Sequence, residues 1–361
     1  MENFTKHTPY LLTACNHDDK ENSGFTLYSI SDKLHFKFDE PFLHEKVFIG
    51  SQHGWLIVLG QHFEPNLLNP LTGESISLPS ITTLQTGRPC YSVNSNIVSY
   101  FCRMEYPPES QFLNCAFDEC LTQVGFRKVL VSSNPSISSS SFFAAALVGT
   151  LFPTLVVARP GENRWNLLRE EEWYMDIMFR QDGKLICLTN EGAIHEVELK
   201  NDKIVITEMS APFHEDKSVF NMYLAEDSVG RVLAIKRDND FSTRPETSDV
   251  KVFRFIGSNR EESQWERVKS LDEEAIFVGA NASISLAKQD IRGEIKPNTI
   301  YFTDEWWQYI GSERSKSRPR DICAYNLTSN SIKPCCPFEH RQCTWPLPIW
   351  IDLSNPNLIL N

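Results

Sequence analysis

The sequence lacks an excess of basic residues, a leader at its N-terminus and any sustained helical periodicity, and each absence excludes a class of protein. It has 35 Lys+Arg against 47 Asp+Glu, a formal net charge of −12. Such a chain has no global positive field for nucleic acid or an anionic membrane, so we expect neither as a partner. Residues 1–6 resemble neither a signal peptide nor a transit peptide, which predicts a cytoplasmic and/or nuclear location. Its 10 cysteines are then expected to be reduced and mostly buried.

Long uncharged runs are also scarce, and one stretch alone reaches the short limit for a membrane span. Residues 142–158 carry no charge over 17 positions. Gly149 and Pro153 interrupt the run as turn residues would. Two buried strands, 142–148 and 154–158, therefore explain it better than a membrane helix.

The common catalytic motifs are missing. There is no G-x-x-x-x-G-K-[ST] loop and no H-E-x-x-H pair. In Gly50-Ser51-Gln52-His53-Gly54 the serine is second rather than central and a strand follows, unlike a nucleophile elbow, so His53 is predicted to be a turn residue. The run 238–240 begins like a calcium loop but lacks its glycine and distal glutamate. We expect no cofactor and no catalytic residue.

One cysteine-rich cluster and two acidic runs contain residue types that occur in metal or catalytic sites. Cys335, Cys336, His340 and Cys343 offer four zinc-ligand types within nine residues, but their spacing matches no common zinc module, so we expect no metal. The acidic runs 170–172 and 272–274 are candidates for an acid–base pair. Such runs are more often solvated turns between strands.

Strand-forming residues are abundant. The chain has 23 Phe, 10 Tyr and 8 Trp, which with many Val, Ile and Thr favour strands over helices. Short strand-like segments recur about every 8–12 residues, a pattern typical of a sandwich, barrel or propeller.

The middle of the chain favours the propeller. Residues 173–207 contain four strand-like runs, separated by turns that include Asp182-Gly183 and Glu191-Gly192. A meander of about 40 residues has the size of one propeller blade. Similar units begin near 47, 221 and 275, whereas 81–130 has a poor strand signal. We predict an all-β chain with a single β-propeller of six or seven four-stranded blades over 8–361, after a tail of residues 1–7.

Several motifs along this pattern resemble a known family. The resemblance covers roughly residues 8–335, and its most specific residues are Gly54, Trp55, Asn69, Pro70, Gly73, Trp165, Trp265, Tyr301 and Phe302. In this combination they resemble the plant F-box-associated β-propeller family of the kink-suppressed-in-bzr type. Trp55 and Trp265 are predicted to pack in the core rather than stack on a ligand.

The resemblance implies a non-enzymatic propeller similar to the substrate-recognition part of F-box proteins in cullin ubiquitin ligases. Its partner would be a ubiquitination substrate or a kinase that the propeller blocks. Family members carry an N-terminal F-box that docks on the cullin adaptor. The given chain begins almost directly with a strand-like run, so we do not expect it to bind the adaptor.

Two further interpretations stay open at this point. A partner-binding site is predicted at Trp306 and Trp307 with the basic residues Arg314, Lys316, Arg318 and Arg320, because neighbouring residues of a strand point opposite ways and one tryptophan would be exposed. The alternative for this run is a solvated loop. The alternative function is a propeller enzyme or glycan-binding module that uses the central channel. It requires carboxylates or histidines converging from several blades, which the sequence alone does not place.

Overall fold

The computed structural model describes residues 8–14, 25–38, 43, 46–60, 64–83, 87–91, 97–106, 109–115, 125–137, 142–149, 153–169, 172–200, 203–212, 222–240, 246–257, 259–303, 321–337, 341 and 347–353. Within these ranges every element is a strand, apart from the short 3-10 helices η2 (Ile81–Thr83) and η3 (Lys288–Asp290). No helix of the described residues is long and apolar enough to cross a membrane.

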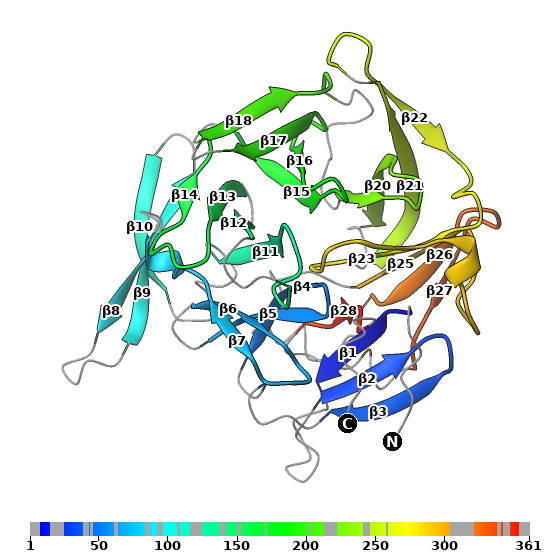
Figure 1. Ribbon diagram of the computed structural model, residues 1–361, viewed down its shortest axis with the longest axis horizontal. Coiled ribbons are helices and arrows are strands. Elements are labelled where there is room, and N and C mark those ends of the chain that lie inside the picture. The colour runs from blue at the N-terminus through cyan, green and yellow to red at the C-terminus, as the bar shows by residue number, and fades with distance from the viewer. Residues whose placement is uncertain are drawn as a thin grey trace.

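Six of the seven sheets in the described residues stand around a central axis as the blades of a propeller (Figure 1). From the axis outwards, blade one contains β28 (Ile349–Ile351), β1 (Tyr10–Ala14), β2 (Phe25–Ser29) and β3 (Leu34–Phe38). Blade two contains β4 (Val47–Gln52), β5 (Trp55–Leu59), β6 (Pro65–Leu68) and β7 (Ser75–Ser77). Blade three contains β11 (Phe126–Val131), β12 (Ala144–Val148), β13 (Thr154–Ala158) and β14 (Asn166–Leu167).

The other half of the ring follows the same plan. Blade four contains β15 (Tyr174–Phe179), β16 (Leu185–Thr189), β17 (Ile194–Lys200) and β18 (Lys203–Glu208). Blade five contains β19 (Met222–Glu226), β20 (Val232–Asp240), β21 (Glu246–Ile256) and β22 (Gln264–Val268). Blade six contains β24 (Ile284–Leu286), β23 (Ala275–Val278), β25 (Thr299–Phe302), β26 (Cys323–Asn326) and β27 (Ser331–Pro334). The predicted all-β propeller is therefore confirmed, and its blade count is six. Five blades have four strands, and blade six has a fifth strand, β24, on its inner side.

The ring closes through the C-terminal strand. β28 pairs antiparallel with β1, with Tyr10 opposite Ile351 and Leu12 opposite Ile349. Trp350, fully buried, donates its indole N–H to the carbonyl of Val278 in blade six over 3.2 Å. The last strand of the chain thus holds the first and last blades together.

The inner strands approach one another closely because they carry β-bulges. The register shifts once near the start of β4, β11 and β15, and such bulges increase local twist. At Gly50 in β4, an added Cβ would lie 2.4 Å from the carbonyl oxygen of Val129 in β11. Blades two and three therefore leave no room for a side chain at this position.

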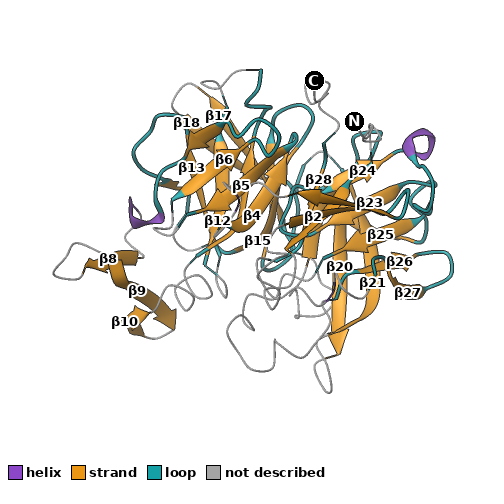
Figure 2. Cartoon of the chain, turned by 90° about the horizontal axis from the view of Figure 1, so that it is seen from below, coloured by secondary structure: helices purple, strands orange, loops and turns teal. Residues whose placement is uncertain are grey.

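Two regions differ from the sequence-based expectation. In blade six β24 folds back on the inner side of β23, and β25 pairs parallel with β23 instead of continuing a meander. The connection over 287–298 makes this possible, since parallel strands need a long crossover, and its Glu294 N–H bonds the carbonyl of Ser31 in blade one over 3.0 Å. Within 81–130, β8 (Gly87–Tyr91), β9 (Ile97–Tyr106) and β10 (Glu109–Cys115) form a separate three-stranded sheet outside the six blades (Figure 2).

The tryptophans of the family-like motifs join neighbouring blades. Trp55 and Trp165 are buried, and Trp265 is half-buried against Phe255. The Trp165 indole donates to the carbonyl of Pro79 in blade two over 2.6 Å. The Trp265 indole donates in the same way to Gly192 in blade four over 3.3 Å. Tyr301 and Phe302 are buried in β25.

Two turns show why their residue types are needed. His53 and Gly54 connect β4 to β5 with φ values of 54° and 78°, in the left-handed region that favours glycine, which confirms His53 as a turn residue. The side-chain oxygen of Asn69 accepts the N–H of Leu71 over 3.0 Å, and Gly73 closes the turn before β7 with φ of 72°.

Candidate functional site

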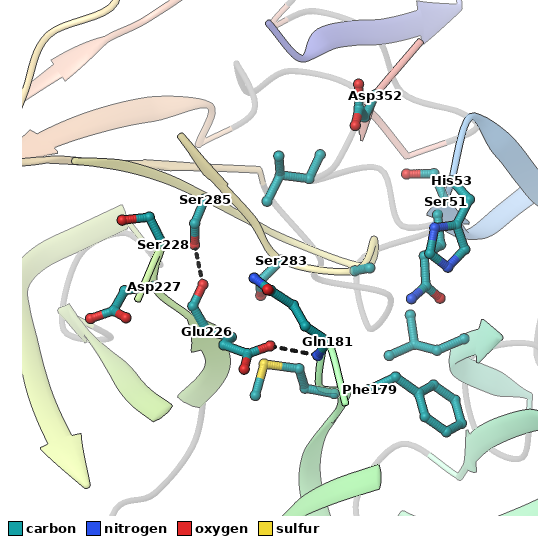
Figure 3. A pocket seen from close by; sticks show the side chains of 15 residues that line it. Ser51, His53, Phe179, Gln181, Glu226, Asp227, Ser228, Ser283, Ser285 and Asp352 are labelled. Carbon is teal, nitrogen blue, oxygen red and sulfur yellow. Dashed lines mark hydrogen bonds between the residues drawn. The ribbon is translucent and has the colours of Figure 1, made fainter. Parts of the chain in front are cut away.

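One end of the central channel opens into a pocket of about 260 Å³, hereafter the channel-mouth pocket. All six blades contribute side chains to its lining (Figure 3). The lining residues are Asp352 from blade one, Ser51, Gln52 and His53 from blade two, Leu130 from blade three, Met178, Phe179 and Gln181 from blade four, Glu226, Asp227 and Ser228 from blade five, and Ala282, Ser283, Ile284 and Ser285 from blade six.

The direction of the inner strands places the pocket at this end. β28, β4, β11, β15 and β19 all finish here, since the lining residues are the last residues of these strands or follow them directly. Polar residues at the ends of β28, β4, β15 and β19 therefore meet at the pocket, and β11 contributes Leu130.

The segment 279–283, which joins β23 to β24, contributes Ala282 and Ser283 to the lining of the pocket. The Ala282 N–H donates to the carbonyl of Ser51 in blade two over 3.0 Å, and the Ser283 hydroxyl donates to the carbonyl of Leu224 in blade five over 2.5 Å. Asn281 lies fully buried between these contacts. This segment therefore links blade six to blades two and five beside the pocket.

Two adjacent carboxylates at the end of β19 have different surroundings. Glu226 accepts the N–H of Gln181 over 2.9 Å (Figure 3) and contacts Arg180 Nε over 3.4 Å. Asp227 is buried and accepts hydrogen bonds from Arg231, both from its backbone N–H and from its guanidinium. Asp227 therefore holds its own turn, whereas Glu226 reaches across to blade four.

His53 and Asp352 form the opposite side of the pocket (Figure 3). Burial lowers the pKa of His53 below 6.5, and the negative charge of Asp352 opposes this shift without cancelling it. The imidazole is therefore neutral near pH 7. The Ser51 hydroxyl donates to the carbonyl of Trp350, so it is held in place by the closing strand.

The other end of the channel, hereafter the closed end, is filled by paired charges. Here Lys128 Nζ lies 2.6 Å from Asp176 Oδ1, and both side chains are buried. Asp176 Oδ2 also accepts the N–H of Leu224 over 2.7 Å. The cavity beside this pair measures about 10 Å³, too small for a ligand. Blades three, four and five are thus tied together.

Arg237 completes the closed end. Its guanidinium donates to the Tyr223 hydroxyl over 3.0 Å, to the Thr303 carbonyl over 3.0 Å and to Asp321 Oδ2 over 3.2 Å. Tyr223 is the second residue of β19, three residues before Glu226 at the mouth. One buried arginine therefore fixes the two residues that flank 304–320.

The predicted partner-binding residues fall in that flanked segment. Trp306, Trp307, Arg314, Lys316, Arg318 and Arg320 lie outside the described residues. Thr303 and Asp321, on either side of the segment, lie at the closed end, away from the channel-mouth pocket.

The structure describes only part of the cysteine cluster that was considered as a zinc site. His340 and Cys343 lie outside the described residues, and burial raises the pKa of the Cys335 thiol. No group of three or more metal-ligating side chains occurs among the described residues. Cys187, Cys323 and Cys336 are free and buried.

Of the acidic runs, 170 and 171 lie outside the described residues. Asp272 and Glu273 form an exposed turn, as expected, with φ values of 53° and 67°. Glu274 corrects the expectation of a solvated run, because it is buried and accepts the N–H of Ser228 over 3.2 Å. This hydrogen bond links blade six to blade five.

Sequence reasoning missed Gln181, Glu226 and Asp352 as pocket residues. Their signal is a position rather than a motif: each lies at or within two residues of the end of an inner strand. That signal becomes visible only when the blades are in register around the ring.

Comparisons with known proteins agree with this architecture. The family model described as the KIB1-4 beta-propeller matches residues 27–326. F-box protein SKIP23 of Arabidopsis thaliana is 24% identical over 212 residues, covering 55% of this chain and 51% of that protein. Putative F-box protein At5g55150 of the same plant is 24% identical over 293 residues, covering 79% of this chain and 71% of that protein. The chain thus spans about half the length of SKIP23.

Proposed function

The chain belongs to the KIB1-4 β-propeller family, and from this premise we propose that it is a non-catalytic module that recognises a partner protein at the mouth of its channel. The relatives that it matches are named F-box proteins, which supports a role in selecting proteins for a ubiquitin ligase. The single observation that carries the proposal is the channel-mouth pocket, where side chains from all six blades converge and five of the blades supply polar ones.

The state of the polar groups favours binding over catalysis. The Ser51 hydroxyl already donates to Trp350, and His53 belongs to a fixed turn. Glu226 and Asp227 are oriented by hydrogen bonds to blade four and to Arg231. Groups fixed in this way offer a preorganised surface, which lowers the entropic cost of binding.

We propose a ubiquitination substrate or a kinase as the partner, in the cytoplasm and/or nucleus. The residues Trp306, Trp307, Arg314, Lys316, Arg318 and Arg320 are a second proposed contact surface, and 8–361 is the proposed extent of the propeller. Binding to the cullin adaptor is not part of this proposal, because the family model matches the propeller only.

A second candidate function, glycan binding at the same pocket, has one observation in its favour. Carboxylates and a histidine do converge there from blades one, two and five, as that function requires. A glycan ligand would stack a sugar on an aromatic ring, and Phe179 supplies the one aromatic side chain in the described lining. Binding to an array of plant glycans, lost on Phe179→Ala, would favour this candidate.

Proximity labelling in plant cells, with the full chain as bait, tests protein recognition. The variant Gln181→Trp fills the mouth, whereas Asp182→Trp adds the same ring one residue away, outside the lining. We expect a set of proteins to be enriched by the natural chain and by Asp182→Trp, and lost with Gln181→Trp. Equal enrichment by all three would rule out the mouth as the recognition surface, and no enrichment over the labelling enzyme alone would contradict the proposed function.

A further inference from the structure

In the described sheets, the outer strand of each blade has a neighbouring strand on one side only, and most of the open edges are protected. β7 has three residues and β14 has two, which leaves little edge for another chain to pair with. β3, β22 and β27 carry charged residues between their two ends, and β27 also ends in a proline. Short strands, charges and proline all discourage pairing with an exposed edge.

β18, the outer strand of blade four, lacks these protections (Figure 1). It is six residues long, and its only charged residues are the first and the last. Ile204 is 40% exposed and Val205 is 51% exposed, although neighbouring residues of a strand face opposite sides of the sheet. The edge of β18 is therefore apolar and accessible on both sides of the sheet.

The register of blade four shows which backbone groups of β18 face outwards. The Met209 N–H donates to the carbonyl of Ile194 in β17 over 2.8 Å. Hydrogen-bonded pairs alternate along an antiparallel ladder, so Val205 and Thr207 also bond to β17. No backbone group of the described residues bonds to the outward-facing positions between them. The residues whose N–H and C=O groups face outwards are Ile204, Ile206 and Glu208.

These outward groups select an extended polypeptide, because an added strand supplies N–H and C=O groups at the same spacing. A second copy of this chain is a poor occupant. Six residues span ~20 Å, so two β18 strands would share a strip of ~200 Å² per copy, against ~800 Å² in a stable interface. The net charge of −12 on each copy also opposes self-association.

We propose that β18 binds an extended segment of a partner protein, which adds to blade four as a fifth strand. The segment is uncharged or basic, and its β-branched or aromatic residues pack on Ile204 and Ile206 on one side of the sheet and on Val205 on the other. β18 lies on the rim of the ring, whereas the inner strands form the mouth. Binding at this edge is therefore separate from recognition at the channel-mouth pocket.

Hydrogen exchange of the isotopically labelled full chain tests the open edge first. The amide hydrogens of Val205 and Thr207 should exchange slowly, because they are bonded to β17. Those of Ile204 and Ile206 should exchange at least tenfold faster, because they face solvent. Slow exchange at all four positions would show that the edge is already covered, and would overturn the inference.

An array of short peptides with random sequences then supplies the probe. Peptides that bind the natural chain should be rich in β-branched and aromatic residues, and should slow exchange at Ile204 and Ile206. Ile204→Pro removes an outward N–H without breaking the ladder to β17, and should weaken binding at least tenfold. The matched control Ile204→Val keeps this N–H and should bind within about twofold of the natural chain. Near-UV circular dichroism checks that both variants are folded.

Two outcomes of the peptide experiment would refute the assignment. One is an affinity that Ile204→Pro leaves unaltered, and the other is the absence of any peptide that slows exchange at this edge. Sedimentation velocity of the natural chain alone should show monomers. Dimers that Ile204→Pro abolishes would make a second copy the occupant and would contradict the proposal.

The variant Gln181→Trp separates this surface from the proposed function. It blocks the mouth and leaves the rim open, so peptide binding should be unchanged. Loss of the peptides with Gln181→Trp would place them at the mouth and overturn the assignment to β18. If proximity labelling recovers no partner while peptides still bind at β18, recognition at the mouth fails and the edge assignment stands.

Discussion

The two ends of the central channel are built from the same short strands, yet they differ in almost every physical respect. β19 carries Tyr223 near its start, beside the buried Arg237, and ends with Glu226 at the open mouth. At the closed end, charges are buried and paired, and the space left is about 10 Å³. At the mouth, polar groups surround a space of about 260 Å³. One strand thus supplies stability with its first residues and a binding surface with its last.

This difference between the two ends predicts where substitutions should affect the free energy of unfolding. Removing one partner of a buried ion pair leaves an uncompensated charge in a poor solvent, whereas an exposed pair contributes little. We therefore expect the closed end to govern the free energy of unfolding and the mouth to govern binding.

The largest expected effect comes from breaking the buried pair of the closed end. Lys128→Met leaves Asp176 charged and buried, and should lower the free energy of unfolding by about 3–5 kcal/mol. Adding Asp176→Asn should recover most of this loss, because the asparagine oxygen can still accept the Leu224 N–H. Urea unfolding measures both. Asp352→Asn at the mouth is the comparison, with a loss of about 1 kcal/mol or less. Similar losses at both ends would contradict the division.

The channel wall between the two ends gives the next largest effect. Gly50→Ala should cost about 1–3 kcal/mol, because its Cβ would lie 2.4 Å from the Val129 carbonyl oxygen. Gly60→Ala is the control, since the nearest atom to its Cβ is the flexible end of Lys46 at 3.6 Å. Thermal unfolding of the two variants checks the difference. A tolerated Gly50→Ala would show that the inner strands can move apart.

The smallest expected effect is a pH dependence that arises at the mouth. Burial lowers the pKa of His53 in the folded state, so the unfolded chain binds the proton more readily. Stability from this group is present above pH 6.5 and is lost as the pH falls from 6.5 through the lowered pKa. His53→Asn keeps the left-handed turn and should flatten the decline. His195, whose pKa burial also lowers, contributes in the same direction. Urea unfolding between pH 7.5 and 5 follows the change, and an unaltered slope would contradict it.

Much of the fold could be predicted from local patterns, whereas the site could not. Gly183 and Gly192 mark tight turns within one blade, so the meander of blade four was visible in the sequence. The pairing of β28 with β1 was not visible, because it joins the two ends of the chain and leaves no local signal. The pocket has the same origin, since Gln181, Glu226 and Asp352 meet only after six blades close.

The most direct test measures the affinity of a partner recovered by proximity labelling for two variants of the full chain, by isothermal titration calorimetry. One variant, Gln181→Trp, blocks the mouth. The other, Arg314→Gln with Lys316→Gln, Arg318→Gln and Arg320→Gln, neutralises the basic run whose flanking residues lie at the closed end. Recognition at the mouth predicts at least a tenfold loss of affinity for the first variant and a smaller loss for the second. Full affinity in the first variant, with loss confined to the second, would contradict it.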